Sequence, residues 1–451
     1  MGEKLLNTYK TIINNNILLS LIIATIIFLS VFFQIYILII LLFLYVAIFN
    51  KNYILAILIT VPIYEAHFFN IPLSINKALI IILFVIFIVN IDYKKIKITK
   101  NEIMILLLLF VITIGSLMGL FNSDLIFMRD NILKEYIFGN MPTIGFMFLF
   151  VLAIKTSKKF NLQQMVKKTV YFIPIFIVLV GILAYKTQYD IDFTRSGILN
   201  IRPNFFAVFT MCIIPFIIYA FFYCKEKIMI LISLVALLVE LYILSITQSR
   251  TGILMFGVSF IISVIVFYKL NKKRLLIGIP LLVGGIIAII FLPVLHGVIE
   301  RVMDARYFIS LENLLNGRYE LYRAGSRVAL ENPIIGYGSS IDVPGFYIYS
   351  ISGIAQVSHN TFLDIVIQYG AYGTIIFFSI YLYFISEFSI KAFSKFNNKY
   401  IWEFPIYIMF ISILVAGLFL SIDLRDIYVY TMMFLFALQY REKNKEVSNG
   451  S

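Results

Sequence analysis

The sequence predicts an all-α, polytopic integral membrane protein with about 12–14 transmembrane helices and one larger extracytoplasmic loop. Hydrophobic residues make up 61% of the 451 positions and charged residues only 14%, which is more apolar side chain than a soluble protein can bury. Many apolar runs also reach the roughly 17–25 residues that a helix needs to cross a bilayer. A β-barrel would show short segments of alternating hydrophobicity instead.

Fourteen apolar runs are candidate spans, and the first two are separated by little more than Gln34. The runs cover residues 17–33, 35–49, 52–69, 75–92, 102–121, 137–155, 167–185, 204–223, 227–246, 251–268, 274–293, 361–386, 401–420 and 424–440. We expect residues 1–440 to form a single transmembrane domain, followed by a short polar tail at 441–451.

The distribution of basic residues predicts the orientation of the chain. Loops rich in Lys alternate with loops poor in Lys, which places both termini and the tail in the cytoplasm. We therefore attribute the net charge of +13 to basic residues that orient the chain in the membrane, and we expect no nucleic-acid partner.

The predicted outer side carries three lysines but ten arginines. The ten are Arg129, Arg195, Arg202, Arg250, Arg301, Arg306, Arg318, Arg323, Arg327 and Arg425. Topology does not require this bias, because Lys orients a loop as well as Arg does. Guanidinium groups bind phosphate and carboxylate oxygens through paired donors in a fixed plane, so the bias predicts an anion site on the outer face. The alternative is that single arginines anchor the chain at headgroups or pair with nearby acids.

The longest predicted outer loop covers residues 294–359. Within it, Arg318–Glu331 has the pattern of an amphipathic helix, with Glu320, Arg323, Arg327 and Glu331 on one face. Asn332-Pro333 ends this helix, and Gly336-Tyr337-Gly338 predicts a tight turn. We expect the loop to form a lid on the membrane surface.

His359 is the first candidate for chemistry, because it lies just before the span that begins near Thr361. A neutral imidazole there can accept a proton from a hydroxyl group, and either Asp364 or Asn360 is placed to orient the ring. The alternative is an interfacial His that only hydrogen-bonds the lid. His296 and His67 also fall on the predicted outer side, where roles in loop tethering and packing are the simpler interpretation.

Two arginines are the main candidates for an anion site. Arg250 lies in the polar break Thr247-Gln248-Ser249-Arg250-Thr251-Gly252, and Arg202 precedes Pro203 at the start of a span. The free N–H groups of a helix N-terminus favour anions beside Arg202. Headgroup anchoring is the alternative for both. The sequence contains no phosphate-binding Gly-rich loop and no carboxylate cluster for a metal, and neither Cys212 nor Cys224 indicates a disulfide or metal site. No cofactor is expected.

Three segments together resemble the bacterial O-antigen ligase and polysaccharide polymerase superfamily, over about residues 195–375. They are Ser249-Arg250-Thr251-Gly252, then Gly317-Arg318 through Arg323 to Glu331-Asn332-Pro333-Ile334-Ile335-Gly336-Tyr337-Gly338, and Ser358-His359-Asn360-Thr361-Phe362-Leu363-Asp364 with Tyr369-Gly370-Ala371-Tyr372-Gly373.

This resemblance implies a GT-C-like, metal-independent, inverting glycosyltransferase in the bacterial cytoplasmic membrane. Its donor would be a glycan linked through pyrophosphate to undecaprenol on the outer leaflet. Arg202 and Arg250 would hold the pyrophosphate, and His359 would act on the acceptor hydroxyl. Arg318, Arg323, Arg327 and Asn360 would help to bind substrate, with membrane lipid, a flippase and a chain-length regulator as further partners.

Three functions remain open. The first is a polymerase that joins lipid-linked oligosaccharide repeats into capsule, exopolysaccharide or O-antigen. The second is a ligase that moves the glycan to lipid A core, a protein or a wall polymer. The third, from a different class, is a transporter or flippase, which would place ionisable residues at mid-membrane in broken helices. The gathering of charge at one surface favours an enzyme.

Overall fold

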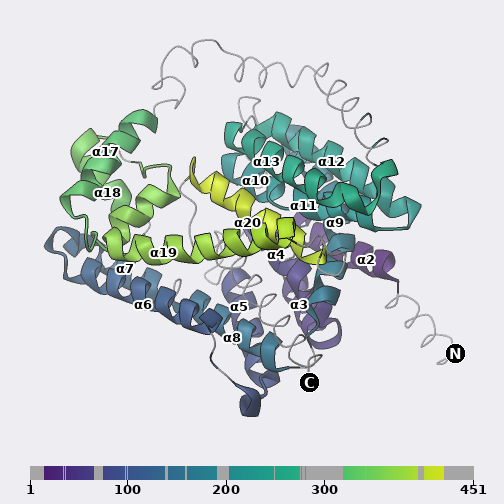
Figure 1. Ribbon diagram of the computed structural model, residues 1–451, viewed down its shortest axis with the longest axis horizontal. Coiled ribbons are helices and arrows are strands. Elements are labelled where there is room, and N and C mark those ends of the chain that lie inside the picture. Colours follow the sequence, from purple (N-terminus) through teal and green to yellow (C-terminus); the bar gives the residue numbers. More distant parts are fainter. Residues whose placement is uncertain are drawn as a thin grey trace, which may run out of the picture. The chain divides into compact units, whose positions relative to one another are not determined.

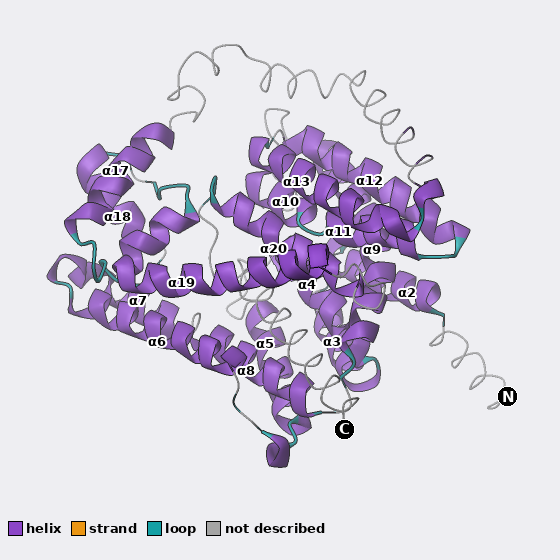
Figure 2. Cartoon of the chain, in the orientation of Figure 1, coloured by secondary structure: helices purple, strands orange, loops and turns teal. Residues whose placement is uncertain are grey.

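The computed structural model describes most of the chain as helices and connecting loops. The described residues are 15–33, 35, 37–65, 75–96, 98, 100–137, 141–157, 160–189, 203–247, 249–274, 276, 280, 318–340, 342–354, 356–394 and 401–420. These ranges contain no strand (Figure 2). Six of the described helices are long and apolar enough to cross a membrane. The predicted fold class, an all-α polytopic membrane protein, is confirmed.

The chain divides into two compact units. Unit 1 comprises Met1–Ile86, Lys158–Val302 and Phe396–Ser412, and unit 2 comprises Phe87–Ser157, Met303–Lys395 and Ile413–Ser451. The predicted spans 274–293 and 424–440 lie almost wholly outside the described residues, and so does the tail 441–451. The expectation of one transmembrane domain stays a prediction.

Unit 1 is built around a long helix, α9 (Leu162–Tyr189), which packs against α2 and α12. Its α-helices, labelled in Figure 1, are α2 (Asn16–Phe32), α3 (Ile37–Phe49), α4 (Ile54–Glu65), most of α5 (Ile75–Asn90), α9, α10 (Pro203–Met211), α11 (Ile214–Tyr223), α12 (Lys227–Thr247), α13 (Arg250–Phe267) and the first part of α20 (Phe404–Gly417). Its short 3-10 helices are η1 (Lys51–Tyr53), η6 (Tyr268–Leu270) and η9 (Ile401–Glu403). The Ser259 and Ser412 hydroxyls lie 2.6 Å apart and join α13 to α20.

The predicted span 204–223 is two helices rather than one. The chain leaves the helical ladder between α10 and α11, where the Ile213 amide donates to the Thr210 carbonyl at 3.3 Å. Pro215 explains the interruption, because it has no N–H to donate to the Met211 carbonyl. This break was not predicted, because residues 204–223 form one apolar run.

Glu240 is a buried carboxyl group within α12. Its side chain is fully shielded from solvent. Neither of its carboxyl oxygens has a hydrogen-bond partner among the described residues. Thr210 on α10 lies beside it, but the Thr210 hydroxyl donates to the carbonyls of Phe206 and Ala207, each at 3.2 Å. An unsatisfied buried polar group of this kind destabilises a fold.

We therefore expect Glu240→Leu to stabilise the protein by about 1–3 kcal/mol, because it replaces the unsatisfied carboxyl with an apolar group of similar volume. Thermal unfolding in detergent measures the effect, with Glu240→Gln as the control that keeps a polar group in place. A lower midpoint for the Leu variant than for the Gln variant would contradict this account.

Unit 2 contains the segments that carry most of the predicted site. Its helices are η2 (Tyr93–Lys95), α6 (Lys100–Phe121), η3 (Ser123–Met128), α7 (Arg129–Glu135), α8 (Met141–Thr156), α17 (Arg318–Glu331), α18 (Asp342–Ser352), α19 (Thr361–Ser394) and the last part of α20. The bounds of α17 and the first residue of α19 are those that the sequence predicts. Helix α18 was not predicted, although Pro344 in its first turn is a helix-start signal.

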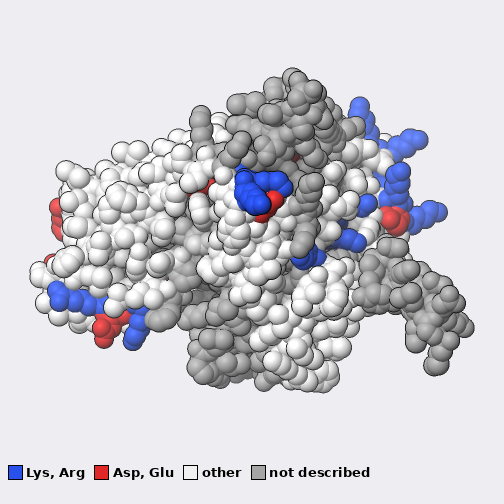
Figure 3. All heavy atoms as spheres, turned by 90° about the horizontal axis from the view of Figure 1, so that it is seen from below, with Lys and Arg blue, Asp and Glu red and all other residues white. Residues whose placement is uncertain are grey.

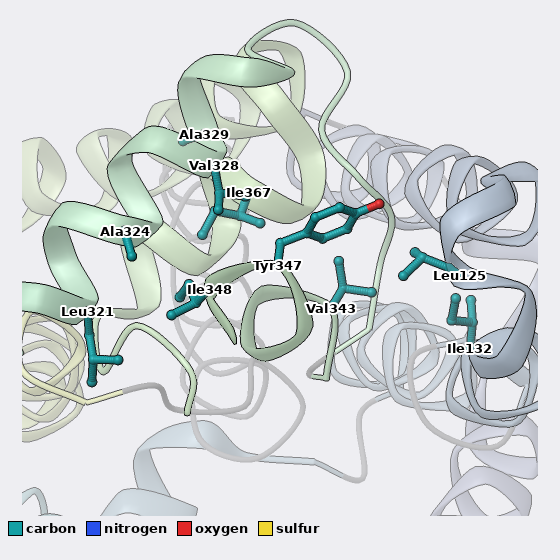
Figure 4. Packing of buried hydrophobic residues seen from close by; sticks show 10 residues of the cluster. All are labelled: Leu125, Ile132, Leu321, Ala324, Val328, Ala329, Val343, Tyr347, Ile348 and Ile367. Atoms are coloured by element: carbon teal, nitrogen blue, oxygen red, sulfur yellow. The ribbon is translucent and has the colours of Figure 1, made fainter. Parts of the chain in front are cut away.

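A hydrophobic cluster joins α17, α18, α19, η3 and α7 of unit 2. It is formed by Leu321, Ala324, Val328 and Ala329 of α17, Val343, Tyr347 and Ile348 of α18, Ile367 of α19, and Leu125 and Ile132 from η3 and α7 (Figure 4). The predicted charged face of α17 points the other way, since Glu320, Arg323, Arg327 and Glu331 are all exposed. Helix α17 is therefore amphipathic, as predicted, and packs within unit 2, while its role as a lid stays a prediction.

Much of the described surface carries no charge. The face drawn in Figure 3 is largely free of charged side chains, with Lys and Arg confined to separate patches. Large apolar side chains such as Val89, Phe110 and Ile265 are more than half exposed. Lipid contact accounts for this exposure, because water disfavours apolar surface of such extent.

Candidate functional site

The predicted site residues fall in both units. Arg250 belongs to unit 1, whereas Arg318, Arg323, Arg327, His359 and Asn360 belong to unit 2. Arg202, His67 and His296 lie outside the described residues. The geometry below is therefore given for each unit separately.

Arg250 is the first residue of α13. The Ser249 hydroxyl caps this helix by accepting the Gly252 amide at 3.1 Å. A side chain at Gly252 would meet Ala207 and Leu244 within 3 Å, so this glycine allows α13 to lie close to α10 and α12. Arg250 itself is half-buried at a helix N-terminus, where free N–H groups and the helix dipole favour an anion. The Ser-Arg-Thr-Gly segment thus fixes the position of one guanidinium group.

His359 occupies a strained backbone position. Its φ angle is 56°, and it is the only non-glycine residue with positive φ among those that the structure describes. Left-handed backbone costs an L-residue about 1–2 kcal/mol, and such strain persists where the surroundings impose it, often at functional sites. This conformation was not predicted.

The neighbours of His359 impose that conformation. The Ser358 hydroxyl accepts the Asn360 amide at 3.0 Å and donates to the Asn360 carbonyl at 2.9 Å. The Asn360 side chain caps α19 by accepting the amides of Phe362 and Leu363 at 3.0 and 3.1 Å. The Asp364 carboxylate accepts the Ser358 amide at 3.3 Å. The predicted partners of the imidazole ring, Asp364 and Asn360, are thus engaged with the backbone that carries the ring.

The end of α20 ties this loop to α17. Three successive carbonyls accept hydrogen bonds there: Leu418 from the Tyr322 hydroxyl at 3.3 Å, Phe419 from Arg318 Nη1 at 2.7 Å, and Leu420 from the Thr361 amide and hydroxyl at 3.1 and 2.7 Å. Carbonyls at a helix C-terminus attract cations, which suits Arg318. Arg318 and the His359 loop therefore meet at the end of α20.

Arg323 and Arg327 lie apart from that place. They occupy the exposed face of α17, and Arg323 is 4.0 Å from Glu320, with both side chains more than half exposed. An exposed ion pair of this length contributes little to stability. These two arginines are available to a ligand that approaches the outer face of the helix.

The Asn-Pro-x-x-Gly-x-Gly segment joins α17 to a break in α19. Helix α19 leaves helical geometry at Gly370, where φ is 60° and ψ is −162°. The Ile367 and Gln368 carbonyls accept the Tyr337 and Gly338 amides at 2.9 and 3.0 Å. In return, the Ala371 amide donates to the Pro333 carbonyl at 2.7 Å. The two segments exchange backbone hydrogen bonds, so the break is satisfied inside the protein, as irregular backbone near a membrane requires.

The same segment also contacts α6, α18 and α19. The Ser339 amide donates to the Gly115 carbonyl at 3.0 Å, and the Ser339 and Tyr369 hydroxyls lie 2.7 Å apart. The side-chain amide of Asn122 donates to the Tyr347 hydroxyl at 2.9 Å, and the centroids of the Tyr337 and Tyr347 rings are 3.9 Å apart. The motif therefore has a structural role that sequence inspection did not assign.

Tyr337 also makes the stability of unit 2 depend on pH. Burial and the nearby Glu331 carboxylate raise the pKa of Tyr337 to about 12. The folded state favours the neutral phenol, so the contribution to stability is complete below the unfolded pKa of about 10 and is lost as the pH rises towards 12. We expect Tyr337→Phe to weaken the loss of thermal stability over this interval. Unfolding midpoints measured at several alkaline pH values test this, and identical slopes for both proteins would contradict it.

Comparison with known families bears on this arrangement. Residues 232–378 match the family model described as O-antigen ligase. The predicted resemblance to the O-antigen ligase and polymerase superfamily is confirmed. The matched segment runs from α12 to α19 and includes Arg250, α17, the Asn-Pro-x-x-Gly-x-Gly segment and His359. The chain matches no curated protein.

The O-antigen ligase family match supports a function of the ligase or polymerase type in a membrane protein that uses lipid-linked glycan. Among the described residues, no group of three or more His, Cys, Asp or Glu side chains is arranged to hold a metal ion. Cys212 and Cys224 are buried and free. Sequence reasoning missed two features of the site, namely Tyr322 and the left-handed backbone of His359.

Proposed function

We propose that this O-antigen ligase-type protein is a polysaccharide polymerase. It joins oligosaccharide repeats carried on undecaprenyl pyrophosphate, at the outer face of the bacterial cytoplasmic membrane. The acceptor hydroxyl oxygen attacks the anomeric carbon of the donor sugar with inversion, and its proton passes to His359. The bond from that carbon to the pyrophosphate oxygen breaks, and the electron pair leaves with the phosphate. Arg250 and Arg202 stabilise the leaving pyrophosphate.

The observation that carries the transfer chemistry, which polymerase and ligase would share, is the conformation of His359. The Ser358, Asn360 and Asp364 contacts hold residue 359 in a strained backbone geometry just before an apolar helix. The backbone conformation alone does not call for a histidine, since Gly or Asn adopts positive φ at lower cost. An imidazole is instead suited to take a proton near neutral pH.

Ligation is the second candidate, because the matching family model is described as O-antigen ligase. The same donor and the same residues would serve both reactions, and only the acceptor differs. A polymerase transfers to the terminal sugar of another lipid-linked chain, whereas a ligase transfers to lipid A core, a protein or a wall polymer.

Glycans from bacterial cells that lack the gene separate the two reactions. For a polymerase, we expect single repeats on the carrier in the deletion strain and a ladder of chain lengths after restoration of the wild-type gene. For a ligase, long chains would accumulate on the carrier instead.

Restoration with Arg250→Ala or His359→Ala tests the site. We expect neither variant to restore the ladder when immunoblots show normal amounts of protein. Normal chain lengths with both variants would overturn the mechanism.

A further inference from the structure

Tyr322 lies where the candidate residues of unit 2 meet. It is on α17, one helical turn after Arg318, and its side chain is partly buried. Its hydroxyl is 3.3 Å from the Leu418 carbonyl and 3.5 Å from the His359 carbonyl. A single phenol thus reaches from the lid helix to both the end of α20 and the backbone of the strained histidine.

The Tyr322 hydroxyl is suited to donate a hydrogen bond. Burial raises its pKa, Arg318 opposes this shift, and the charge on Asp364 adds to it. The net effect is upward, so the phenol keeps its proton at any pH near neutrality and is unsuited to act as a base. Its single O–H proton is shared between the two carbonyls that face it, at 3.3 Å for Leu418 and 3.5 Å for His359.

Further hydrogen bonds described for the loop come from its own residues and from α20. Ser358, Asn360 and Asp364 bond within the loop, and Thr361 bonds to Leu420. None of these contacts involves α17. The Tyr322 hydroxyl is therefore a described polar link between the lid helix and His359, and it acts on the carbonyl of the residue whose φ angle is 56°.

We propose that Tyr322 is a positioning residue, whose hydroxyl couples the placement of α17 to the orientation of His359. When the lid helix is seated, the hydroxyl holds the His359 backbone and so aims the imidazole at the acceptor. This inference rests on the proposed function, because it assigns Tyr322 a role that is exerted through His359.

The test is a double-mutant cycle with Tyr322→Phe and His359→Asn, measured as glycan transfer by the purified protein in lipid nanodiscs. Tyr319→Phe is the matched control, since Tyr319 is also a partly buried tyrosine of α17. We expect Tyr322→Phe to lower kcat by roughly tenfold or more with little change in KM, because misplacement of a catalytic group slows the chemical step. Tyr319→Phe is expected to behave as wild type.

The cycle distinguishes positioning from general support of the fold. If Tyr322 acts through His359, then Tyr322→Phe has no further effect on the residual rate of His359→Asn. A purely structural role would lower both rates by the same factor and would overturn the inference. A Tyr322→Phe variant with wild-type kcat beside an inactive His359→Asn would sink this inference alone. Wild-type activity of His359→Asn would sink the proposed function as well.

Discussion

Gly370→Ala is expected to prevent correct folding of unit 2. Residue 370 has a φ angle of 60°, and an alanine Cβ there would overlap the backbone of Ile334 and lie 2.6 Å from the Ile335 amide nitrogen. Gly336→Ala meets the same obstacle from the other side, since its Cβ would lie 2.6 Å from the Gln368 carbonyl oxygen and the Gly370 nitrogen. Backbone atoms cannot move aside without breaking the exchanged hydrogen bonds, so each change should cost about 4 kcal/mol or more.

The yield of monodisperse protein and its thermal midpoint measure this effect. Gly353→Ala is the matched control, because Gly353 also has positive φ, at 70°, but no atom lies within 4 Å of its added Cβ. It should cost only the backbone strain of about 1–2 kcal/mol. Equal behaviour of the three variants would show that the exchange between the two segments does not support the fold.

His359→Gly is expected to lose activity while it keeps the left-handed backbone at residue 359. Glycine adopts the left-handed backbone freely, and the relief of about 1–2 kcal/mol offsets the greater freedom of glycine in the unfolded chain, about 0.4–1 kcal/mol. Removal of the imidazole should lower the transfer rate by about 10²–10⁴-fold if it takes the acceptor proton. Initial rates and thermal midpoints of the same preparations test both statements.

His359→Asn is the companion variant, since asparagine tolerates positive φ and keeps a hydrogen-bonding side chain but has no basic nitrogen. A large fall in stability with either variant would mean that the ring supports the loop structurally. A wild-type rate with both variants would remove His359 from the chemistry.

Many elements of the fold were predictable, because the spacing of hydrophobic residues and the position of helix-ending residues are local features of the sequence. The apolar runs, the charged face of α17 and the stop at Asn332-Pro333 each follow from a few neighbouring residues. The breaks between α10 and α11 and at Gly370 were not predicted. The apolar run continues through the first break, so Pro215 was read as part of one span. The break at Gly370 depends on hydrogen bonds with residues 333–338, which are distant in the chain.

The residues of the candidate site come from the sequence, and their roles stay predictions. The bias towards Arg and the position of His359 singled out Arg250, α17 and the His359 loop, which lie inside the segment that matches the family model. Asn360 and Arg318 make structural hydrogen bonds that their motif does not disclose. The sequence did not single out Tyr322, because a tyrosine in an amphipathic helix is usually a packing residue. Its hydrogen-bond partners are also distant in the chain.

Labelling of single cysteines in intact cells most directly tests the claim that Arg250 and His359 act together on the outer face. Arg250→Cys and His359→Cys, each made in a protein whose buried Cys212 and Cys224 are replaced by alanine, are treated with a membrane-impermeant maleimide. Lys95→Cys serves as the control for the predicted inner face, since Lys95 is well exposed. We expect labelling at 250 and 359 without lysis, and at 95 only after lysis. Labelling of 250 or 359 only after lysis would place them on different faces or both inside, and would contradict the account.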